Sequence, residues 1–190
     1  MSTSDSFEQS PGVLVVVVGP SGAGKDTLIE AARRHFADDP RLRFPKRVIT
    51  RRDQAGETHL AVTDKRFDEL CAESAFFLHW AAHGTRYGIG FEILSDLGSG
   101  KLVTVNVSRG MIGLAQEKWP HVRVVNVWAP PEILRERLLA RGREGSEALE
   151  ERLERDVPLP GDGEVADIEN SGSREAAAAR FIALLEEYAG

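Results

Sequence analysis

The chain has 190 residues, of which 42% are hydrophobic and 28% charged. A chain of this length predicts one domain that buries about 70% of its unfolded surface. The net charge of −6 argues against a nucleic-acid-binding surface. The longest apolar run, residues 13–18, is too short to span a membrane, and the one cysteine, Cys71, excludes an intramolecular disulfide. We therefore expect a cytoplasmic protein without nucleic-acid or membrane partners, and the sequence leaves a homodimer open.

Short apolar runs alternate with helix-like stretches along the chain, which is typical of an α/β fold with a mainly parallel central sheet. Residues 13–18 are all Val or Leu, as in a strand that is covered on both faces, and residues 26–36 then have helical spacing. Later strands, each followed by a helix, are expected at residues 101–107 (helix 109–118), 122–128 (helix 132–141) and 164–169 (helix 174–188).

Two polar stretches interrupt this alternation. Residues 46–90 contain short extended pieces and one helix-like segment at 64–73, and residues 141–156 are highly charged. Both are expected above the strand ends, where ligands of open α/β sheets bind. We interpret them as an acceptor-binding insertion and a lid within a single domain at residues 12–190, preceded by a disordered tail at residues 1–11.

The strongest motif is G-x-x-x-x-G-K at residues 19–25, directly after the first predicted strand. A buried strand, a glycine-rich turn and a helix together are the context of a phosphate-binding loop. Its backbone N–H groups curl around anionic oxygens, the helix N-terminus adds partial positive charge, and Lys25 is expected to reach the β- and γ-phosphates of ATP. The expected nucleotide contacts are Gly19, Pro20, Ser21, Gly22, Ala23, Gly24, Lys25, Asp26 and Thr27.

The residue after Lys25 departs from the motif. Ser or Thr normally stands there and holds Mg²⁺, but this chain has Asp26. A carboxylate in a first helical turn is favoured electrostatically whatever its function. However, the strand at residues 101–107 has Asn106 where NTPases of this class usually carry an Asp for Mg²⁺. Because Mg²⁺ often takes only one or two protein carboxylates, we interpret Asp26 as the magnesium ligand, with Thr27 as a nearby hydroxyl and Asn106 as a neutral contact.

The order of motifs from residue 13 to residue 188 resembles that of guanylate kinase and its relatives. The segment from Arg47 through Arg51, before Gly56-Glu57, is similar to their acceptor-phosphate segment, and residues 84–88 (GTRYG) resemble their G-x-x-Y-G turn. This likeness implies acceptor binding by Arg47, Arg51, Arg86 and Tyr87.

The C-terminal half continues the resemblance. Residues 137–142 (RLLARG), followed by Arg152, are similar to the lid arginines that close over the transferred phosphoryl group. The resemblance thus implies catalytic roles for Arg137, Arg141 and Arg152. Asn170 stands where the family has an Asn near the adenine.

The departures from guanylate kinase concern the reading of guanine. Guanylate kinases use a Glu in an F-L-E segment, where this chain is interpreted to have Phe77, Leu78 and His79, and they have an Asp where this chain has Asn106. Loss of these carboxylates leaves guanine N–H donors without partners, which is costly for specificity. GMP is therefore not the expected substrate.

A narrower resemblance is to the ribose 1,5-bisphosphate phosphokinases of phosphonate degradation. The shared stretches are GPSGAGKD, ITR, HWAAHGTRYGIG, VNVSRG and RLLARGRE. The resemblance implies ATP-dependent formation of 5-phospho-α-D-ribose 1-diphosphate, with Mg²⁺ as cofactor. A sugar bisphosphate needs cationic side chains at each of its two phosphates, and Asn106 and Arg109 are expected to complete the acceptor site.

Two alternatives remain open at this point. A nucleoside monophosphate kinase with altered base specificity would need another base-reading group near His79 or Asn106. A noncatalytic guanylate-kinase-like interaction module would need neither an intact phosphate loop nor a full set of lid arginines, both of which this chain has in sequence.

Overall fold

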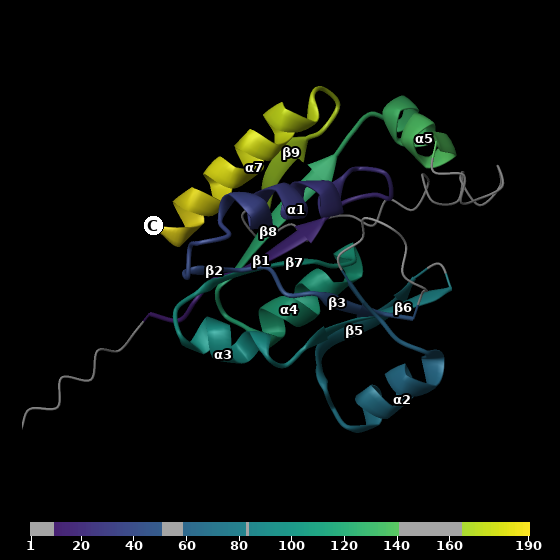
Figure 1. Ribbon diagram of the computed structural model, residues 1–190, viewed down its shortest axis with the longest axis vertical. Helices are drawn as coiled ribbons and strands as arrows, with labels where there is room; N and C mark the ends of the chain where they lie inside the picture. The colour runs from purple at the N-terminus through teal and green to yellow at the C-terminus, as the bar shows by residue number, and fades with distance from the viewer. Residues whose placement is uncertain (1–9, 51–58, 83, 141–164) are drawn as a thin grey trace, which may run out of the picture.

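A five-stranded parallel sheet forms the centre of the structure (Figure 1), a computed structural model that describes residues 10–50, 59–82, 84–140 and 165–190. The strand order is β2-β7-β1-β8-β9, and every pairing is parallel. The carboxyl ends of the strands therefore meet at one edge, which is where such sheets bind ligands. The strands are β1 (Leu14–Val18), β2 (Leu42–Arg43), β7 (Leu102–Asn106), β8 (Val122–Trp128) and β9 (Val165–Glu169).

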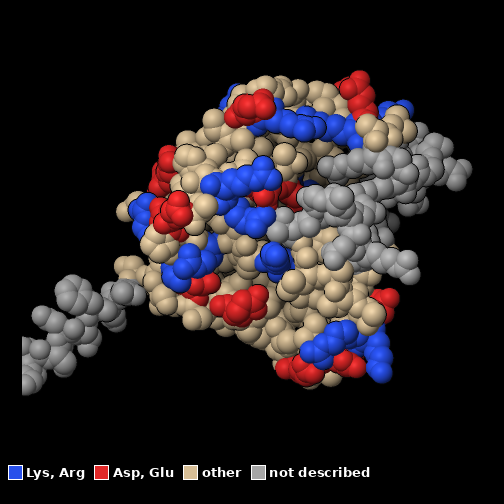
Figure 2. Space-filling model, in the orientation of Figure 1, with Lys and Arg blue, Asp and Glu red and all other residues tan. Residues whose placement is uncertain are grey.

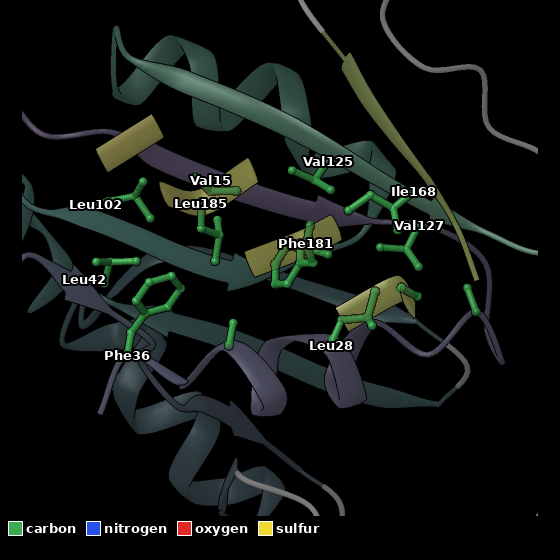
Figure 3. Close-up of a cluster of buried hydrophobic side chains, with 14 of the residues drawn as sticks. Val15, Leu28, Phe36, Leu42, Leu102, Val125, Val127, Ile168, Phe181 and Leu185 are labelled. Atoms are coloured by element: carbon green, nitrogen blue, oxygen red, sulfur yellow. The ribbon is translucent and has the colours of Figure 1, made fainter. Parts of the chain in front are cut away.

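Helices cover both faces of this sheet. One face packs against α1 (Lys25–His35) and α7 (Arg174–Ala189), and Figure 3 shows Leu28, Phe181 and Leu185 of these helices directed at the strands. The other face packs against α3 (Ile93–Gly98) and α4 (Ile112–Lys118).

The valine-rich run of β1 serves both faces at once. Val15 and Val17 belong to the core cluster beneath α1 and α7, whereas Leu14, Val16 and Val18 belong to the cluster on the opposite face. Successive side chains of a strand point to opposite faces, so a strand with helices or a second sheet on both sides must be apolar throughout. Burying each such side chain contributes roughly 1.5–3 kcal/mol.

A second, four-stranded sheet lies beside the first, with the order β4-β3-β6-β5. One of its faces packs on the central sheet through Leu78, Trp80 and Ile89. The other face is covered by α2, whose Phe67 ring lies 4.8 Å from that of Phe76. Its elements are β3 (Arg47–Ile49), β4 (His59–Ala61), α2 (Asp64–Ala72), β5 (Phe76–Ala82) and β6 (Thr85–Gly90).

The α/β fold with a parallel central sheet is confirmed, and the strands and helices predicted along the described chain are present with small shifts at their ends. The helix predicted at residues 109–118 begins as a 3-10 turn, η1 (Arg109–Met111), and the one predicted at 132–141 is α5 (Pro131–Ala140). The short β2 and α3 were not predicted. The lid and most of the predicted tail lie outside the described residues.

Charged side chains of both signs stand next to one another on the face drawn in Figure 2. Ion pairs join Arg33 and Arg34 to Glu30, and Arg41 to Asp39. Exposed pairs of this kind contribute about 0–1 kcal/mol each, so these three arginines have an ordinary surface role. Within the described ranges, no helix combines the length and apolar character needed to cross a bilayer.

Candidate active site

The turn between β1 and α1 has a backbone that only glycine accommodates at its ends. Gly19 has φ of 141° and Gly24 has φ of 91°. A Cβ atom would lie 2.0 Å from the carbonyl oxygen of Val127 at the first position and 2.3 Å from Nδ2 of Asn170 at the second. Both distances are far inside van der Waals contact. The end of β8 and Asn170 therefore pack tightly against the loop.

Lys25 is the first residue of α1 and folds back over this loop. Its Nζ donates hydrogen bonds to the carbonyl oxygens of Gly19 at 2.7 Å and Pro20 at 2.9 Å. The ammonium group and the partial positive charge of the helix N-terminus thus meet at the same place. A loop of this kind is suited to an anion such as a phosphate group.

Asp26 joins three elements at the edge of the loop. Its Oδ1 accepts hydrogen bonds from Nη2 of Arg47 on β3 at 2.9 Å and from Nδ2 of Asn106 at the end of β7 at 2.8 Å. The side chain is nevertheless 68% exposed. Two donors thus orient a carboxylate that solvent still reaches.

This arrangement fits a hydrated Mg²⁺ ion. Carboxylate oxygen is a preferred ligand, and Mg²⁺ at kinase sites takes the rest of its shell largely from substrate phosphates and water. Among the described residues there is no group of three or more His, Cys, Asp or Glu side chains that could hold a metal by itself. Thr27, the other predicted ligand, is exposed on the next position of α1.

An aromatic stack supports Arg47. The guanidinium carbon lies 5.5 Å from the centroid of the Tyr87 ring, and Tyr87 stacks on Trp80 with centroids 5.3 Å apart and an interplanar angle of 12°. The two aromatic residues are direct cross-strand partners on β5 and β6. The second sheet therefore presents Arg47 to Asp26 on a rigid aromatic base. The register of Trp80 opposite Tyr87 is what gives it this role.

His79 lies on the face of β5 opposite to that of Trp80. A register shift between Phe76 and Leu78 places Phe76 and His79 on the α2 side, with their rings 6.1 Å apart. Leu78, which is 1% exposed, lies instead on the face shared with Trp80 and Tyr87. This face of β5 is thus apolar and packs in the core between the two sheets.

Arg86 is not brought to this group. It neighbours Tyr87 on β6 and points to the opposite face, as alternate strand residues do. Its Nη1 donates to Oδ1 of Asp68 at 2.7 Å, and its guanidinium lies 4.3 Å from the centroid of Phe67. The hydrogen bond to Asp68 raises the pKa of the Arg86 guanidinium above its usual value. In the structure, Arg86 ties α2 to the second sheet rather than joining Arg47 and Tyr87.

Arg109 lies just beyond the end of β7. Its Nη2 donates to Oδ1 of Asn126 on β8 at 3.3 Å, and Nδ2 of Asn126 donates to Oδ1 of Asp167 on β9 at 2.7 Å. The sequence analysis predicted Arg109 as a site residue, but it did not predict Asn126 or Asp167. A polar residue within the run VRVVNVW was the available signal.

Arg137 reaches the loop from α5. Its Nη1 donates to the carbonyl oxygen of Gly22 at 3.4 Å. The predicted lid arginine is therefore close to the loop. Arg51, Arg141 and Arg152, also predicted as site residues, lie outside the described residues.

Asn170 contacts the loop itself. The side chain is 3% exposed, and its Nδ2 donates to the carbonyl oxygen of Ala23 at 2.8 Å. Its backbone N–H donates to the carbonyl oxygen of Trp128 at 2.8 Å, which fixes the residue at the end of β8. The sequence placed Asn170 near the adenine, whereas the structure has its amide buried against the loop.

Replacement of Asn170 by Ala should therefore loosen the loop. The buried carbonyl of Ala23 loses its donor, which costs about 1–3 kcal/mol of stability. Urea denaturation should show this loss, and calorimetric titration with ATP should show weaker binding. Ser171→Ala is the matched control, because the Ser171 hydroxyl bonds Glu169 and not the loop. Equal ATP affinity in the Asn170 variant and the control would contradict this role.

In sequence, the chain is similar to ribose 1,5-bisphosphate phosphokinases. The chain is 44% identical over 177 residues to the ribose 1,5-bisphosphate phosphokinase of Rhizobium etli, covering 92% of this chain and 90% of that protein. It is 43% identical over 175 residues to the enzyme of the same name from Methylobacterium radiotolerans, covering 98% of that protein. A bifunctional ribose 1,5-bisphosphokinase-thymidine phosphorylase from Azorhizobium caulinodans is 43% identical, and the chain spans 25% of its length. No protein-family model matches the chain.

Solved structures agree on the fold. A guanylate kinase from Anaplasma phagocytophilum superposes with a TM-score of 0.66 at 22% identity, over 94% of this chain and 87% of that one. A gluconokinase from Sinorhizobium meliloti gives a TM-score of 0.54 at 19% identity, over 94% of each chain. These likenesses show the fold, whereas the two phosphokinases from Rhizobium etli and Methylobacterium radiotolerans match in sequence over nearly the whole of both chains. The chain belongs to the ribose 1,5-bisphosphate phosphokinase family.

Proposed function

We propose that this protein transfers the terminal phosphoryl group of ATP to the 1-phosphate of ribose 1,5-bisphosphate. The products are 5-phospho-α-D-ribose 1-diphosphate and ADP. The observation that carries the proposal is the ion pair between Asp26 and Arg47, which joins the phosphate loop directly to the second sheet. Membership in the family supplies the substrate class.

The loop and α1 form the nucleotide half of the site. Backbone N–H groups near Gly22 and Gly24 and the ammonium of Lys25 bind the phosphates of ATP. Lys25 already lies over the loop, held by two carbonyl oxygens, so little reorganisation precedes binding. Arg137 approaches from α5 to stabilise charge on the transferred group, together with the lid arginines Arg141 and Arg152.

Asp26 is the protein ligand proposed for Mg²⁺. An Mg²⁺ ion held there would neutralise part of the negative charge of the ATP phosphates. Asn106 and Arg47 hold the Asp26 carboxylate in place from two sides. Asn106 is 6% exposed, so it provides a fixed and neutral support at the end of β7.

The acceptor half of the site lies between the second sheet and the end of the central sheet. Arg47 and Tyr87 bind one phosphate of the sugar, and Arg109 binds the other. Guanidinium groups suit this task because they bind phosphate oxygens in pairs. The attacking 1-phosphate is already ionised, so the reaction requires positioning and charge stabilisation rather than a strong base.

The apolar surroundings of this half-site argue against a purine base. On the described strands of the second sheet, the face that carries Leu78, Trp80 and Tyr87 holds no carboxylate. A base with several N–H donors would leave them without charged acceptors there. A sugar bisphosphate has no such requirement. The proposed reaction involves only small molecules.

The test is a phosphoryl-transfer assay with ATP and Mg²⁺, followed by ³¹P NMR. Ribose 1,5-bisphosphate and GMP are offered as acceptors in parallel reactions, with the Lys25→Ala protein as the blank. We expect a diphosphate at C1 of the sugar and no GDP. Formation of GDP without the sugar diphosphate would instead identify a guanylate kinase, and formation of neither product would contradict the proposed reaction.

A further inference from the structure

Asn126 is a buried polar residue in a strand that is otherwise rich in valine. Its side chain is 7% exposed, and in the sheet it lies beside Val18 of β1 and Asp167 of β9. It shares a face of β8 with Val124, which belongs to the core cluster that also contains Leu78 and Ile89 of the second sheet. Asn126 therefore lies on the face of the central sheet that looks toward the second sheet.

Both ends of this amide are used by other side chains. Nδ2 donates to Asp167 at 2.7 Å, and Oδ1 accepts from Arg109 at 3.3 Å. Arg109 follows β7, whereas Asn126 belongs to β8, and β1 separates the two strands. The Arg109 side chain therefore crosses the end of β1, from which the phosphate loop begins. This contact fixes a guanidinium beside the loop.

Stability alone does not account for a polar residue at this position. A buried amide is costly unless its hydrogen bonds are made, and replacing buried polar groups with apolar ones of similar size is often neutral or stabilising. Valine would continue the pattern of β8. The amide instead fixes the direction of the Arg109 side chain, because Arg109 must lie where Oδ1 of Asn126 can accept its hydrogen bond. Asp167 in turn fixes the orientation of the Asn126 amide.

The neutral amide also keeps the Asp167 carboxylate one side chain away from Arg109. Direct contact with a carboxylate would offset the positive charge that a phosphate dianion needs. An amide oxygen instead orients the guanidinium without adding a negative charge beside it. The arrangement thus suits an arginine that must bind an anionic substrate.

We propose that Asn126 and Asp167 are positioning residues that hold Arg109 against one phosphate of the acceptor. The inference rests on the proposed function and deepens it. Arg47 on the second sheet binds one phosphate of the acceptor and Arg109 binds the other. Two such cationic groups favour acceptors with two phosphates over those with one.

The test compares KM values for the two substrates in full-length variants. Asn126→Ala should raise the KM for ribose 1,5-bisphosphate about tenfold, because a hydrogen bond to a charged group is lost. The KM for ATP should stay within about twofold of the original value. Asp167→Ala should act in the same direction, whereas Asp167→Asn retains an acceptor for the Asn126 amide and should restore nearly normal kinetics.

Thr104→Val is the matched control for a buried polar residue in another strand of the central sheet. Thr104 is 1% exposed in the middle of β7, two residues from Leu102, which packs in the cluster beneath α1. Its replacement should leave both KM values unchanged. Thermal melts of all variants check that the differences in KM arise in folded protein.

The outcomes separate the two proposals. No product from the unaltered protein would overturn the proposed function and this inference with it. Normal turnover of the unaltered protein, together with an unchanged sugar KM in Asn126→Ala, would overturn the positioning role alone. An equal rise of both KM values, or failure of Asp167→Asn to restore the sugar KM, would also overturn that role.

Discussion

Replacement of Lys25 by Ala is expected to lower kcat by about 10²–10³-fold, the effect typical of removing one preorganised electrostatic group. The Nζ atom lies 2.7 Å and 2.9 Å from two carbonyl oxygens of the loop, so its charge is fixed at the proposed phosphate-binding loop. Charge on the transferred phosphoryl group is spread over its oxygens in the transition state. A fixed cation stabilises that state without reorganisation, and kcat should therefore fall more than ATP affinity.

Steady-state kinetics with ribose 1,5-bisphosphate and ATP check this expectation. Lys65→Ala is the matched control, because Lys65 is an exposed lysine on α2. The control should retain normal kcat. A Lys25 variant that lost ATP affinity in full but kept its kcat would show that Lys25 contributes only ground-state binding.

The phosphate loop could be predicted from the sequence because every contribution to it is local. The strand, the glycines and Lys25 lie within residues 14–25, and their order alone defines the turn. Strand β1 was predictable for a similar reason, since it is a continuous apolar run, and β7 and β8 are largely apolar. The second sheet was harder to predict because β3, β4, β5 and β6 are short, and their pairing depends on register rather than composition.

The directions of individual side chains account for the differences between the site predicted from the sequence and the arrangement in the structure. Arg86 and Tyr87 are adjacent in the motif, but strand alternation sends them to opposite faces of β6. The register shift in β5 similarly places Leu78 on the face shared with Trp80 and Tyr87, and His79 on the opposite face. A sequence motif identifies the segment, and only the pairing of strands decides which of its residues face the substrate.

Asn126 was missed for a different reason. Its partner Asp167 lies 41 positions away in the chain, and Arg109 lies 17 positions away. Such contacts arise from the order β7-β1-β8-β9, which the sequence does not state. In contrast, Asp26 and Asn106 were both singled out, because each departs from a familiar pattern, and they contact each other at 2.8 Å.

Asp26→Asn is expected to raise the Mg²⁺ concentration needed for half-maximal activity about tenfold and to lower kcat about 10²-fold. The amide keeps the size of the side chain but removes the charge that a magnesium ion prefers. Stability should change by less than about 1 kcal/mol, because Asp26 is largely exposed. Magnesium titrations at fixed ATP, with Asp38→Asn as an exposed control, measure the effect. Unchanged magnesium dependence would leave Asp26 as an ordinary first-turn carboxylate.

A pair of variants then tests whether Asp26 replaces the magnesium-binding carboxylate that kinases of this class usually carry at the position of Asn106. Asp26→Ser restores the hydroxyl of the usual motif, but it should remain impaired because Asn106 supplies no charge. Asp26→Ser combined with Asn106→Asp returns the carboxylate to the end of β7. Since the two side chains are in hydrogen-bond contact, this exchange displaces the charge only slightly, and we expect the double variant to recover part of the magnesium affinity. If the double variant is no better than Asp26→Ser, Asp26 acts through Arg47 and not through the metal.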